Sequence, residues 1–421
     1  MKRKLAFIGL VVALAAALVA GASVQASDAG SGRVRVIVGF DPAVNEPARE
    51  ALMARFGGVE PKPLPIIDGA VVLLPVPALS ALAGEPGVRF AEADQRVFAF
   101  DKPPWAGQPG GPGDDEEEPP PQVVPTGIDR IDAEPTEGGN TGSGVKVAVI
   151  DTGIDYTHPD LDLNYAGGYD YVNDDDDPMD DNGHGTHVAG IIGAEDNDIG
   201  VVGVAPGVSL YAVKVLDNRG SGWISDIIAG IDWAVENEMD VANLSLGGKG
   251  TSDALETAVQ NAASEGVTLV VSAGNESDDA AYYVPAAYDE VITVSAIADF
   301  DGLPGGLGGS KRYGRGRFKT VQADDAFAYF SNYGQAVDLA APGVDIYSTY
   351  AGGGYETMDG TSMAAPHVAG AAALYIAAHP GAVPSAVEQG LQNAGWSHGD
   401  YEYFTDDPDA YAEPLLNAGS L

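Results

Sequence analysis

Between residues 145 and 379, short apolar runs rich in β-branched residues alternate with stretches of helical periodicity. The runs are VKVAVI (145–150), SLYAVKVL (209–216), DVANLSL (240–246), VTLVVSA (267–273), EVITVSA (290–296) and AVDLAAPG (336–343); the helical stretches include 225–238, 252–265 and 362–379. Continuously apolar strands between helices are typical of a parallel sheet that is covered on both faces. We therefore predict an α/β fold with a doubly wound, mostly parallel sheet and helices on both faces. In such folds the ligand site lies beyond the carboxyl ends of the strands.

The chain before this pattern divides into three segments of different composition. Residues 1–26 have basic residues, then an apolar run of about 16 residues, then small residues, which is the plan of a signal peptide. A membrane anchor is the alternative, but the run is short for a span. Residues 27–100 contain a small α+β unit, and residues 101–121 are a linker of proline, glycine and acidic residues. The main domain is then 122–421, in a protein that we expect to be secreted into the extracellular medium.

The composition excludes several classes of function. The chain has 62 acidic and 21 basic residues, a formal net charge of −41, which repels nucleic acids and anionic membrane surfaces. We expect no nucleic-acid partner and no membrane association after the signal peptide is removed. The absence of cysteine excludes disulfides and thiol chemistry. Many exported proteins are stabilised by disulfides, so bound cations are candidates for stabilising this fold instead.

Polar residues lie where two of the strands end and where the helical stretch 362–379 begins. Asp151 follows VKVAVI, Asn275 follows VTLVVSA, and Ser362 begins the helix at 362–379, whose free N–H groups favour a developing anion. A serine hydroxyl becomes an effective nucleophile when a base takes its proton and an anion orients that base. Asp151, His184 and Ser362 could supply the anion, the base and the nucleophile. Asn275 and the backbone N–H of Ser362 could stabilise the oxyanion.

Each of these residues, taken alone, also has a structural interpretation. Asp151 fits a turn at a strand end, Ser362 fits a helix N-cap, and His184 fits a buried core histidine. The pair His184 and His187 also suggests metal ligands. The glutamate and the spacing of an HExxH zinc site are absent, however.

Five segments carry a family resemblance: AVIDTGID (148–155), NGHGTHVAG (182–190), NLSLGG (243–248), SAGNE (272–276) and GTSMAAPHVAG (360–370). In this order they resemble the motifs of the subtilisin-like serine peptidases, and the resemblance extends from residue 122 to the C-terminus. It implies a serine endopeptidase that works through an acyl-enzyme intermediate. The order of Asp151, His184 and Ser362 is the one known for subtilisin, as is the oxyanion role of Asn275. The resemblance makes His184 the base and gives His187 a packing role on the helix; we expect His367 to be structural too.

The resemblance also implies how protein and peptide substrates bind. A peptide would lie as an extra strand between residues 221–225 and 245–248, so backbone pairing would give broad specificity. Tyr283 departs from the pattern, because many relatives have glycine at this wall, and its phenol would shorten the first specificity pocket. The expected substrate-binding residues are Gly220, Ser221, Gly222, Ser245, Leu246, Gly247, Ala273, Gly274 and Tyr283.

By the same resemblance, residues 27–100 are an inhibitor-type propeptide with a ferredoxin-like fold, which assists folding and blocks the site as an intramolecular inhibitor. We expect self-cleavage between Phe98 and Gln122. The alternative is an independent binding domain.

Two acid-rich loops resemble calcium sites of the family, and calcium suits such sets of oxygen ligands. The first site would comprise Gln122, Asp160, Glu195, Asn197, Ile199 and Val201. The second would comprise Asp170, Asp175 and Asp177, for which a solvated acidic loop is the alternative.

Other classes of function fit less well. A pseudo-enzyme that only binds peptides or polymers would not need a complete set of catalytic residues. A secreted esterase of the α/β-hydrolase type would need GxSxG and the order Ser, Asp, His, and this chain has neither.

Residues 305–320 form a basic insertion, which is either a mobile loop or a segment that docks on acidic loops or on an anionic partner. The leading hypothesis is a secreted, monomeric, calcium-stabilised serine endopeptidase made as a self-processing zymogen.

Overall fold

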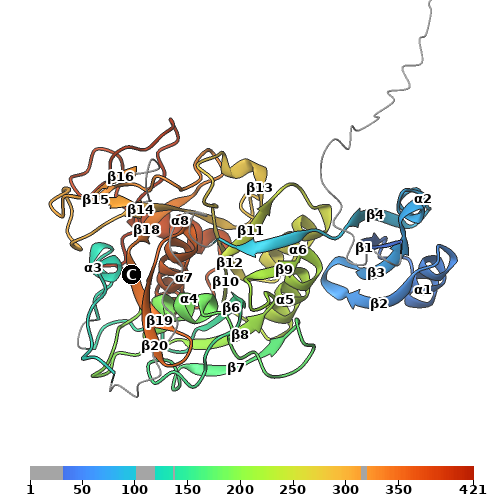
Figure 1. Ribbon diagram of the computed structural model, residues 1–421, viewed down its shortest axis with the longest axis horizontal. Coiled ribbons are helices and arrows are strands. Elements are labelled where there is room, and N and C mark those ends of the chain that lie inside the picture. The colour runs from blue at the N-terminus through green and yellow to red at the C-terminus, as the bar shows by residue number, and fades with distance from the viewer. Residues whose placement is uncertain (1–31, 101–118, 136–137, 314–319) are drawn as a thin grey trace, which may run out of the picture.

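A computed structural model describes residues 32–100, 119–135, 138–313 and 320–421 (Figure 1). The predicted signal peptide and most of the predicted linker lie outside the described residues. Within the described part of the chain, no helix is both long and apolar enough to cross a membrane.

Residues 33–93 form a small domain with one four-stranded sheet in the order β2-β3-β1-β4. Each neighbouring pair of strands is antiparallel, and β1 lies next to β3 because the intervening helix and strand cross over. Its apolar core includes Val36, Val38 and Leu74, all fully buried. The elements are β1 (Arg33–Phe40), α1 (Glu46–Arg55), β2 (Val59–Leu64), β3 (Gly69–Pro75), α2 (Leu79–Ala83) and β4 (Val88–Ala93).

The large domain is built on an eight-stranded sheet with the order β17-β14-β12-β10-β6-β8-β7, in which β18 also pairs with β14. All pairs are parallel except β14 with β17. The strands are β6 (Lys146–Asp151), β7 (Tyr165–Asp170), β8 (Ser209–Lys214), β10 (Val241–Leu244), β12 (Thr268–Ser272), β14 (Ile292–Ala298), β17 (Ala326–Phe327) and β18 (Leu339–Val344). The predicted mostly parallel sheet is confirmed.

Helices cover both faces of this sheet, which explains why its strands are apolar at consecutive positions. In β6, Val147 and Val149 pack with α4 and α7, whereas Ala148 and Ile150 pack with α5 and α6. The helices are α3 (Thr126–Arg130), α4 (His184–Gly193), α5 (Ile224–Glu236), α6 (Asp253–Ser264), α7 (Thr361–Ala378) and α8 (Pro384–Ala394). The chain runs from β6 to β7 and β8 on one side and then to β10 on the other, so the sheet order reverses at β6.

The segment 88–100 forms two strands in different sheets. β4 ends at Ala93 in the small domain, and β5 (Arg96–Ala99) joins β9 (Ser221–Trp223), β11 (Leu246–Lys249) and β13 (Tyr283–Val284) of the large domain. Asp94 separates them: it is 8% exposed and accepts hydrogen bonds from Arg35 Nε (2.6 Å) and Ser225 Oγ (2.7 Å). The split therefore depends on contacts between the two domains.

The small domain lies against α5 and α6 (Figure 1). Two of its carboxylates meet the starts of these helices, where free backbone N–H groups favour negative charge. Asp94 accepts from the backbone N–H of Ser225 at 3.1 Å, and Glu92 accepts from that of Asp253 at 3.1 Å. These contacts fix the direction in which the chain enters β5.

Residues 310–313 of the basic insertion form β15 (Ser310–Tyr313), which pairs with β16 (Thr320–Ala323) at the end of the insertion. Lys311 Nζ lies 2.6 Å from Asp345 Oδ2 and 4.3 Å from the centre of the Phe300 ring. At Lys311 the insertion thus docks on an acidic residue of the same chain. Two further strands, β19 (Ile346–Tyr350) and β20 (Gly354–Met358), form a hairpin that packs on α4.

Candidate active site

Asp151 and His184 meet at the carboxyl edge of the sheet. Asp151 is the last residue of β6, and His184 is the first residue of α4. His184 Nδ1 lies 2.7 Å from Asp151 Oδ1, and neither side chain is exposed. The same Oδ1 accepts from the backbone N–H of Thr152 at 2.7 Å. This contact puts the donor N–H on Nδ1 and leaves Nε2 as the nitrogen that can take up a proton.

A buried carboxylate that the sequence reasoning missed fixes the start of α4. Asp180 is 6% exposed and accepts from Thr152 Oγ1 (2.9 Å), the Gly183 N–H (2.9 Å) and the Thr186 N–H (2.9 Å). It therefore ties the loop after β6 to the first turn of the helix that carries His184. The acidic residue four positions before His184 in DDNGH was the available signal.

Ser362 and Asn275 converge on the carbonyl group of Phe100. The Ser362 hydroxyl lies 2.9 Å from the Phe100 carbonyl oxygen and 3.1 Å from that of Ser245. Asn275 Nδ2 donates to the Phe100 oxygen at 2.7 Å. Asn275 is itself fixed, because its Oδ1 accepts from the Thr361 N–H and the Thr361 hydroxyl, both at 2.9 Å. Two polar groups at the start of α7 and the end of β12 thus surround one carbonyl oxygen.

Glycine at position 360 is required by the close approach of this carbonyl group. A Cβ atom there would lie 2.8 Å from the Phe100 oxygen and 3.2 Å from Asn275 Nδ2. Both distances are shorter than ordinary contacts, so a side chain would displace the carbonyl group.

The last residues of the small domain lie as a strand in the large domain. β5 is antiparallel to β9 on one side and to β11 on the other, with Val97 opposite Gly222 and Phe98 opposite Gly247. The backbone N–H of Ala99 donates to the Gly220 oxygen at 2.9 Å. An extended segment therefore lies between the two backbone segments that the resemblance singled out for a peptide.

The Phe100 side chain is buried at the end of this strand, 6% exposed. A Cβ atom on Gly247 would lie 2.7 Å from Phe100 Cζ, so glycine makes room for the ring. The remaining predicted residues lie on neighbouring segments. Leu246 pairs with Ala99, and Ser245 Oγ donates to the backbone oxygen of Ser362 at 2.8 Å. Ala273 and Gly274 follow β12, and the Gly274 N–H donates to Thr361 Oγ1 at 3.1 Å.

Tyr283 begins β13, opposite Lys249 of β11, and is 3% exposed. Its hydroxyl donates to Asp278 Oδ2 at 3.3 Å, and Lys249 Nζ lies 5.3 Å from the ring centre. The effect of Tyr283 on the depth of the pocket stays a prediction.

The structure brings the residues of the first predicted calcium site together. Asp160 is fully buried, and its oxygens accept from Asn197 Nδ2 and the Val201 N–H, both at 2.9 Å. Burial raises the pKa of Asp160 to about 6. Pro121 and Val123, on either side of Gln122, form β-bridges with Ile199 and Val201. The Glu195 N–H donates to the backbone oxygen of Asp160. Carboxylate, amide and backbone oxygens are the ligands that calcium prefers.

The second predicted calcium loop has a different arrangement. Asp170 is buried and accepts from the backbone N–H groups of Val172 (2.7 Å) and Asn173 (2.9 Å). Asp175 Oδ1 accepts from the Asp177 N–H, and Asp177 Oδ1 accepts from the Tyr156 hydroxyl. These carboxylates fold the loop by local hydrogen bonds, and the three do not form a joint ligand group in the described structure.

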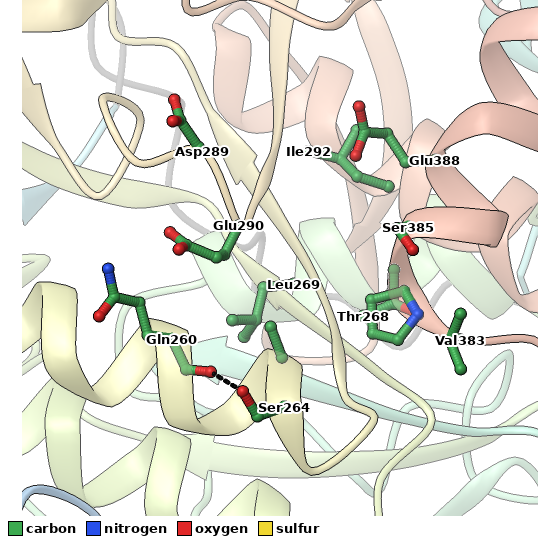
Figure 2. Close-up of a pocket in the computed structure, with 12 residues that line it drawn as sticks. Gln260, Ser264, Thr268, Leu269, Asp289, Glu290, Ile292, Val383, Ser385 and Glu388 are labelled. Carbon is green, nitrogen blue, oxygen red and sulfur yellow. Dashed lines mark hydrogen bonds between the residues drawn. The ribbon is translucent and has the colours of Figure 1, made fainter.

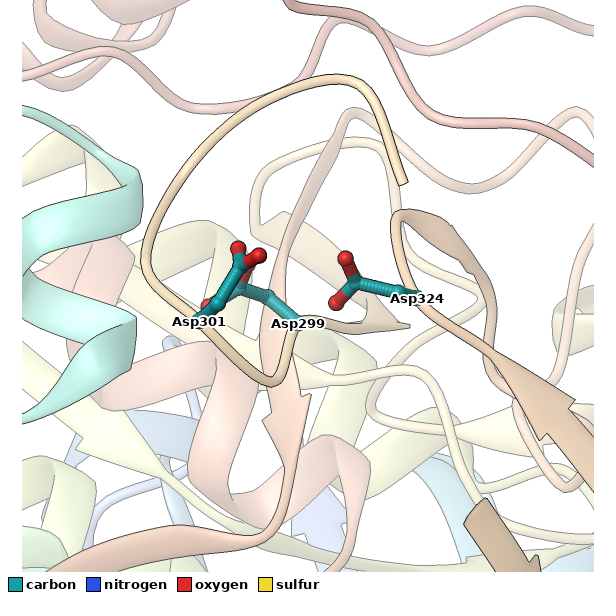
Figure 3. Close-up of side chains that lie close together, drawn as sticks. All are labelled: Asp299, Asp301 and Asp324. Carbon is teal, nitrogen blue, oxygen red and sulfur yellow. The ribbon is translucent and has the colours of Figure 1, made fainter. Parts of the chain in front are cut away.

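One group of three carboxylates within 4.8 Å of one another is found among the described residues, at Asp299, Asp301 and Asp324 (Figure 3). Burial raises the pKa of Asp299 to about 7, and Arg130 Nε lies 4.0 Å from its Oδ1. Arg130 also pairs with Asp325 at 2.7 Å. Sequence reasoning missed this group because Asp324 and Arg130 lie in other segments of the chain than Asp299 and Asp301. We interpret the contacts of Arg130 with Asp299 and Asp325 as a buried ion-pair network.

Two of the remaining histidines have structural roles. His187 Nε2 donates to the backbone oxygens of Ile346 (3.0 Å) and Glu356 (3.1 Å), which joins α4 to the β19–β20 hairpin. His367 is fully buried, and burial lowers its pKa to about 4, so it stays neutral while its Nδ1 donates to the Met363 oxygen.

A surface hollow of about 620 Å³ lies away from these residues, among α6, β12, β14 and α8 (Figure 2). Its rim includes the carboxylates of Asp289, Glu290 and Glu388. At Ser362, residues 96–100 of the same chain lie between β9 and β11.

The fold and the site together define an α/β protein of the serine-hydrolase class, with an Asp–His pair and a buried serine at the carboxyl edge of a parallel sheet. Residues 142–410 match the sequence model of the subtilase family. The chain belongs to this family and is a serine endopeptidase.

Two relatives and one solved structure each match most of this chain. Subtilisin E of Bacillus subtilis (strain 168) is 38% identical over 390 residues, which are 91% of this chain and 90% of that protein. Subtilisin Savinase of Lederbergia lenta is 44% identical over 298 residues, covering 70% of this chain and 98% of that protein. The crystal structure of a cold adapted subtilisin-like serine proteinase matches with a TM-score of 0.57 and 37% identity, over 70% of this chain and 97% of that one.

Proposed function

We propose that this chain is a secreted serine endopeptidase, made as a zymogen that cuts itself between Phe100 and Asp101. One observation carries the proposal: the carbonyl oxygen of Phe100 lies 2.9 Å from the Ser362 hydroxyl and 2.7 Å from Asn275 Nδ2. A carbonyl group held between a nucleophile and an oxyanion donor is in the position of a scissile bond.

The geometry supports the following reaction. Ser362 Oγ attacks the Phe100 carbonyl carbon while His184 Nε2 takes the hydroxyl proton, and Asp151 stabilises the resulting imidazolium through Nδ1. The oxygen becomes an anion and is stabilised by Asn275 Nδ2; the backbone N–H of Ser362 is the second predicted donor. The intermediate then breaks the C–N bond, and His184 gives its proton to the amine of Asp101. Water hydrolyses the ester by the same steps, and protein substrates follow the same route after residues 96–100 leave the cleft.

The zymogen proposal assigns residues 27–100 to a propeptide that inhibits the enzyme by occupying its cleft. The pairing of β5 with β9 and β11, and the contacts of Asp94 and Glu92 with the starts of α5 and α6, support this assignment. Export is supported by the signal-peptide composition of residues 1–26.

Replacing Phe100 with alanine is expected to slow self-processing about 10- to 100-fold. The buried ring contributes apolar burial in the pocket beside Gly247, and burial of such a side chain is worth about 1.5–3 kcal/mol. The measurement is the rate at which the full chain converts to a species with Asp101 at its N-terminus.

Phe98→Ala is the matched control, because the Phe98 side chain is 52% exposed and should matter little. Equal effects of the two substitutions, or a first cut at another bond in the wild type, would contradict the assignment of Phe100.

We also propose that calcium stabilises the mature enzyme, bound at the site of Asp160 and its neighbours. A second ion would bind the loop of Asp170, Asp175 and Asp177 after these carboxylates turn toward one another. Chelation should lower the Tm of the mature protein by about 5 °C or more. A ligand at a hundredfold excess over its Kd contributes about 2.7 kcal/mol, and each kcal/mol shifts the Tm of a domain of this size by about 2–4 °C.

Thermal unfolding with calcium and with a chelator measures this shift. Asp160→Asn should remove most of the response, whereas Asp177→Asn reports on the second loop alone. A wild-type Tm that does not change on chelation would contradict calcium stabilisation.

A further inference from the structure

We propose that Asp217, Ser221 and Trp223 form a subsite for an arginine side chain four residues before the residue whose carbonyl group is attacked. This inference rests on the proposed function, because it takes residues 96–100 as the occupants of the substrate cleft. In that register Phe100 precedes the scissile bond and Arg96 is the fifth residue before it.

Three kinds of contact hold the Arg96 guanidinium. Its Nη2 donates to Ser221 Oγ at 2.6 Å and lies 3.5 Å from Asp217 Oδ2, and its Cζ lies 4.7 Å from the centre of the Trp223 ring. A hydroxyl, a carboxylate and an indole face are complementary to the edge, the charge and the plane of a guanidinium. A lysine ammonium matches the charge but has no plane to stack.

The subsite is positioned by backbone pairing. Arg96 lies opposite Trp223 in the β5–β9 ladder. Asp217 Oδ1 accepts from the Ser221 N–H at 3.1 Å and the Arg219 N–H at 2.9 Å, so its other oxygen is directed at the guanidinium. Any peptide that binds as β5 does would place its corresponding side chain at this point.

A second guanidinium lies on the same surface. Arg35 Cζ lies 5.5 Å from the Trp223 ring, and Arg35 pairs with Asp226 at 2.6 Å. Both arginines belong to the proposed propeptide, whereas Asp217, Ser221, Trp223 and Asp226 belong to the proposed mature enzyme. When the propeptide leaves, two carboxylates and an indole lose their cationic partners, and a substrate arginine can replace Arg96.

The experiment uses the mature enzyme obtained from the full chain and two peptides with a chromogenic leaving group. One has the sequence Arg-Val-Phe-Ala-Phe, and the other has citrulline, a neutral isostere, in place of arginine. We expect kcat/KM to be about three- to thirtyfold higher for the arginine peptide, the range given by one partly exposed cation–π contact with one partly exposed ion pair. High salt should reduce this ratio, because salt screens exposed charges.

Asp217→Asn and Trp223→Leu should each bring the ratio of the two kcat/KM values toward one. Asp174→Asn, which removes an exposed carboxylate elsewhere, and Trp233→Leu, which removes an indole that packs near Tyr211, are the matched controls and should keep the wild-type ratio.

The outcomes are distinct. Equal kcat/KM for the two peptides in the wild type overturns the subsite and leaves the proposed function intact, and this comparison needs no variant to fold. If the wild type cuts neither peptide, the proposed function fails and the subsite fails with it.

Discussion

Replacing Ser362 with alanine is expected to lower kcat on a protein substrate by about a millionfold and to leave the chain uncut at Phe100. The change removes the nucleophile, which lies 2.9 Å from the Phe100 carbonyl oxygen, and leaves Asn275 in place. The size of the loss is the one measured in subtilisin, where residual activity comes from the oxyanion site and substrate binding. Casein hydrolysis and the intact mass of the purified chain measure the two effects.

Ser264→Ala is a matched control, because Ser264 lies on the exposed face of α6 and its hydroxyl donates to the backbone oxygen of Gln260. This variant should process and digest casein like the wild type. A Ser362→Ala protein that accumulated at the processed mass in a host without other proteases would contradict self-cleavage.

Removing the Asn275 donor is expected to lower kcat about 100- to 1000-fold with a small change in KM. The amide stabilises charge that develops on the oxygen only in the transition state, and the figure is that found for the oxyanion asparagine of subtilisin. Steady-state kinetics on a peptide substrate measure the loss.

Two substitutions separate this role from a structural one. Asn275→Asp keeps an oxygen that accepts from the Thr361 N–H and hydroxyl, whereas Asn275→Ala removes that acceptor as well. If Nδ2 acts on the oxyanion, both variants lose activity. If Asn275 only positions Thr361, the aspartate variant would keep most of it.

Much of the large domain could be predicted because its physical causes are local. Strands such as VKVAVI are apolar at consecutive positions because helices cover both faces, and a polar residue directly after such a strand must lie at the sheet edge, as Asp151 does. Ser362 at the start of α7 follows from the same kind of argument. The choice of His184 over His187 needed the family motif, since both lie on one buried helix.

Other features depend on contacts between segments that are distant in sequence. β4 and β5 are separate strands because Asp94 accepts hydrogen bonds from Arg35 and Ser225. No local sequence pattern predicts this break between the strands. The proposed scissile position at Phe100 follows from the register of β5 against β9 and β11, so sequence reasoning could only bracket it between Phe98 and Gln122. The group of Asp299, Asp301 and Asp324 depends on a contact between two segments, because Asp324 lies far along the chain from the other two residues.

The central claim is that Ser362, activated by His184 and Asp151, is the nucleophile of this enzyme. Labelling of the mature protein with a fluorophosphonate, followed by mass spectrometry of its peptides, tests it most directly. The account predicts one adduct per chain, on Ser362, formed in the wild type and lost in His184→Ala. An adduct on another residue, or full proteolytic activity in a protein whose Ser362 carries the label, would contradict the account.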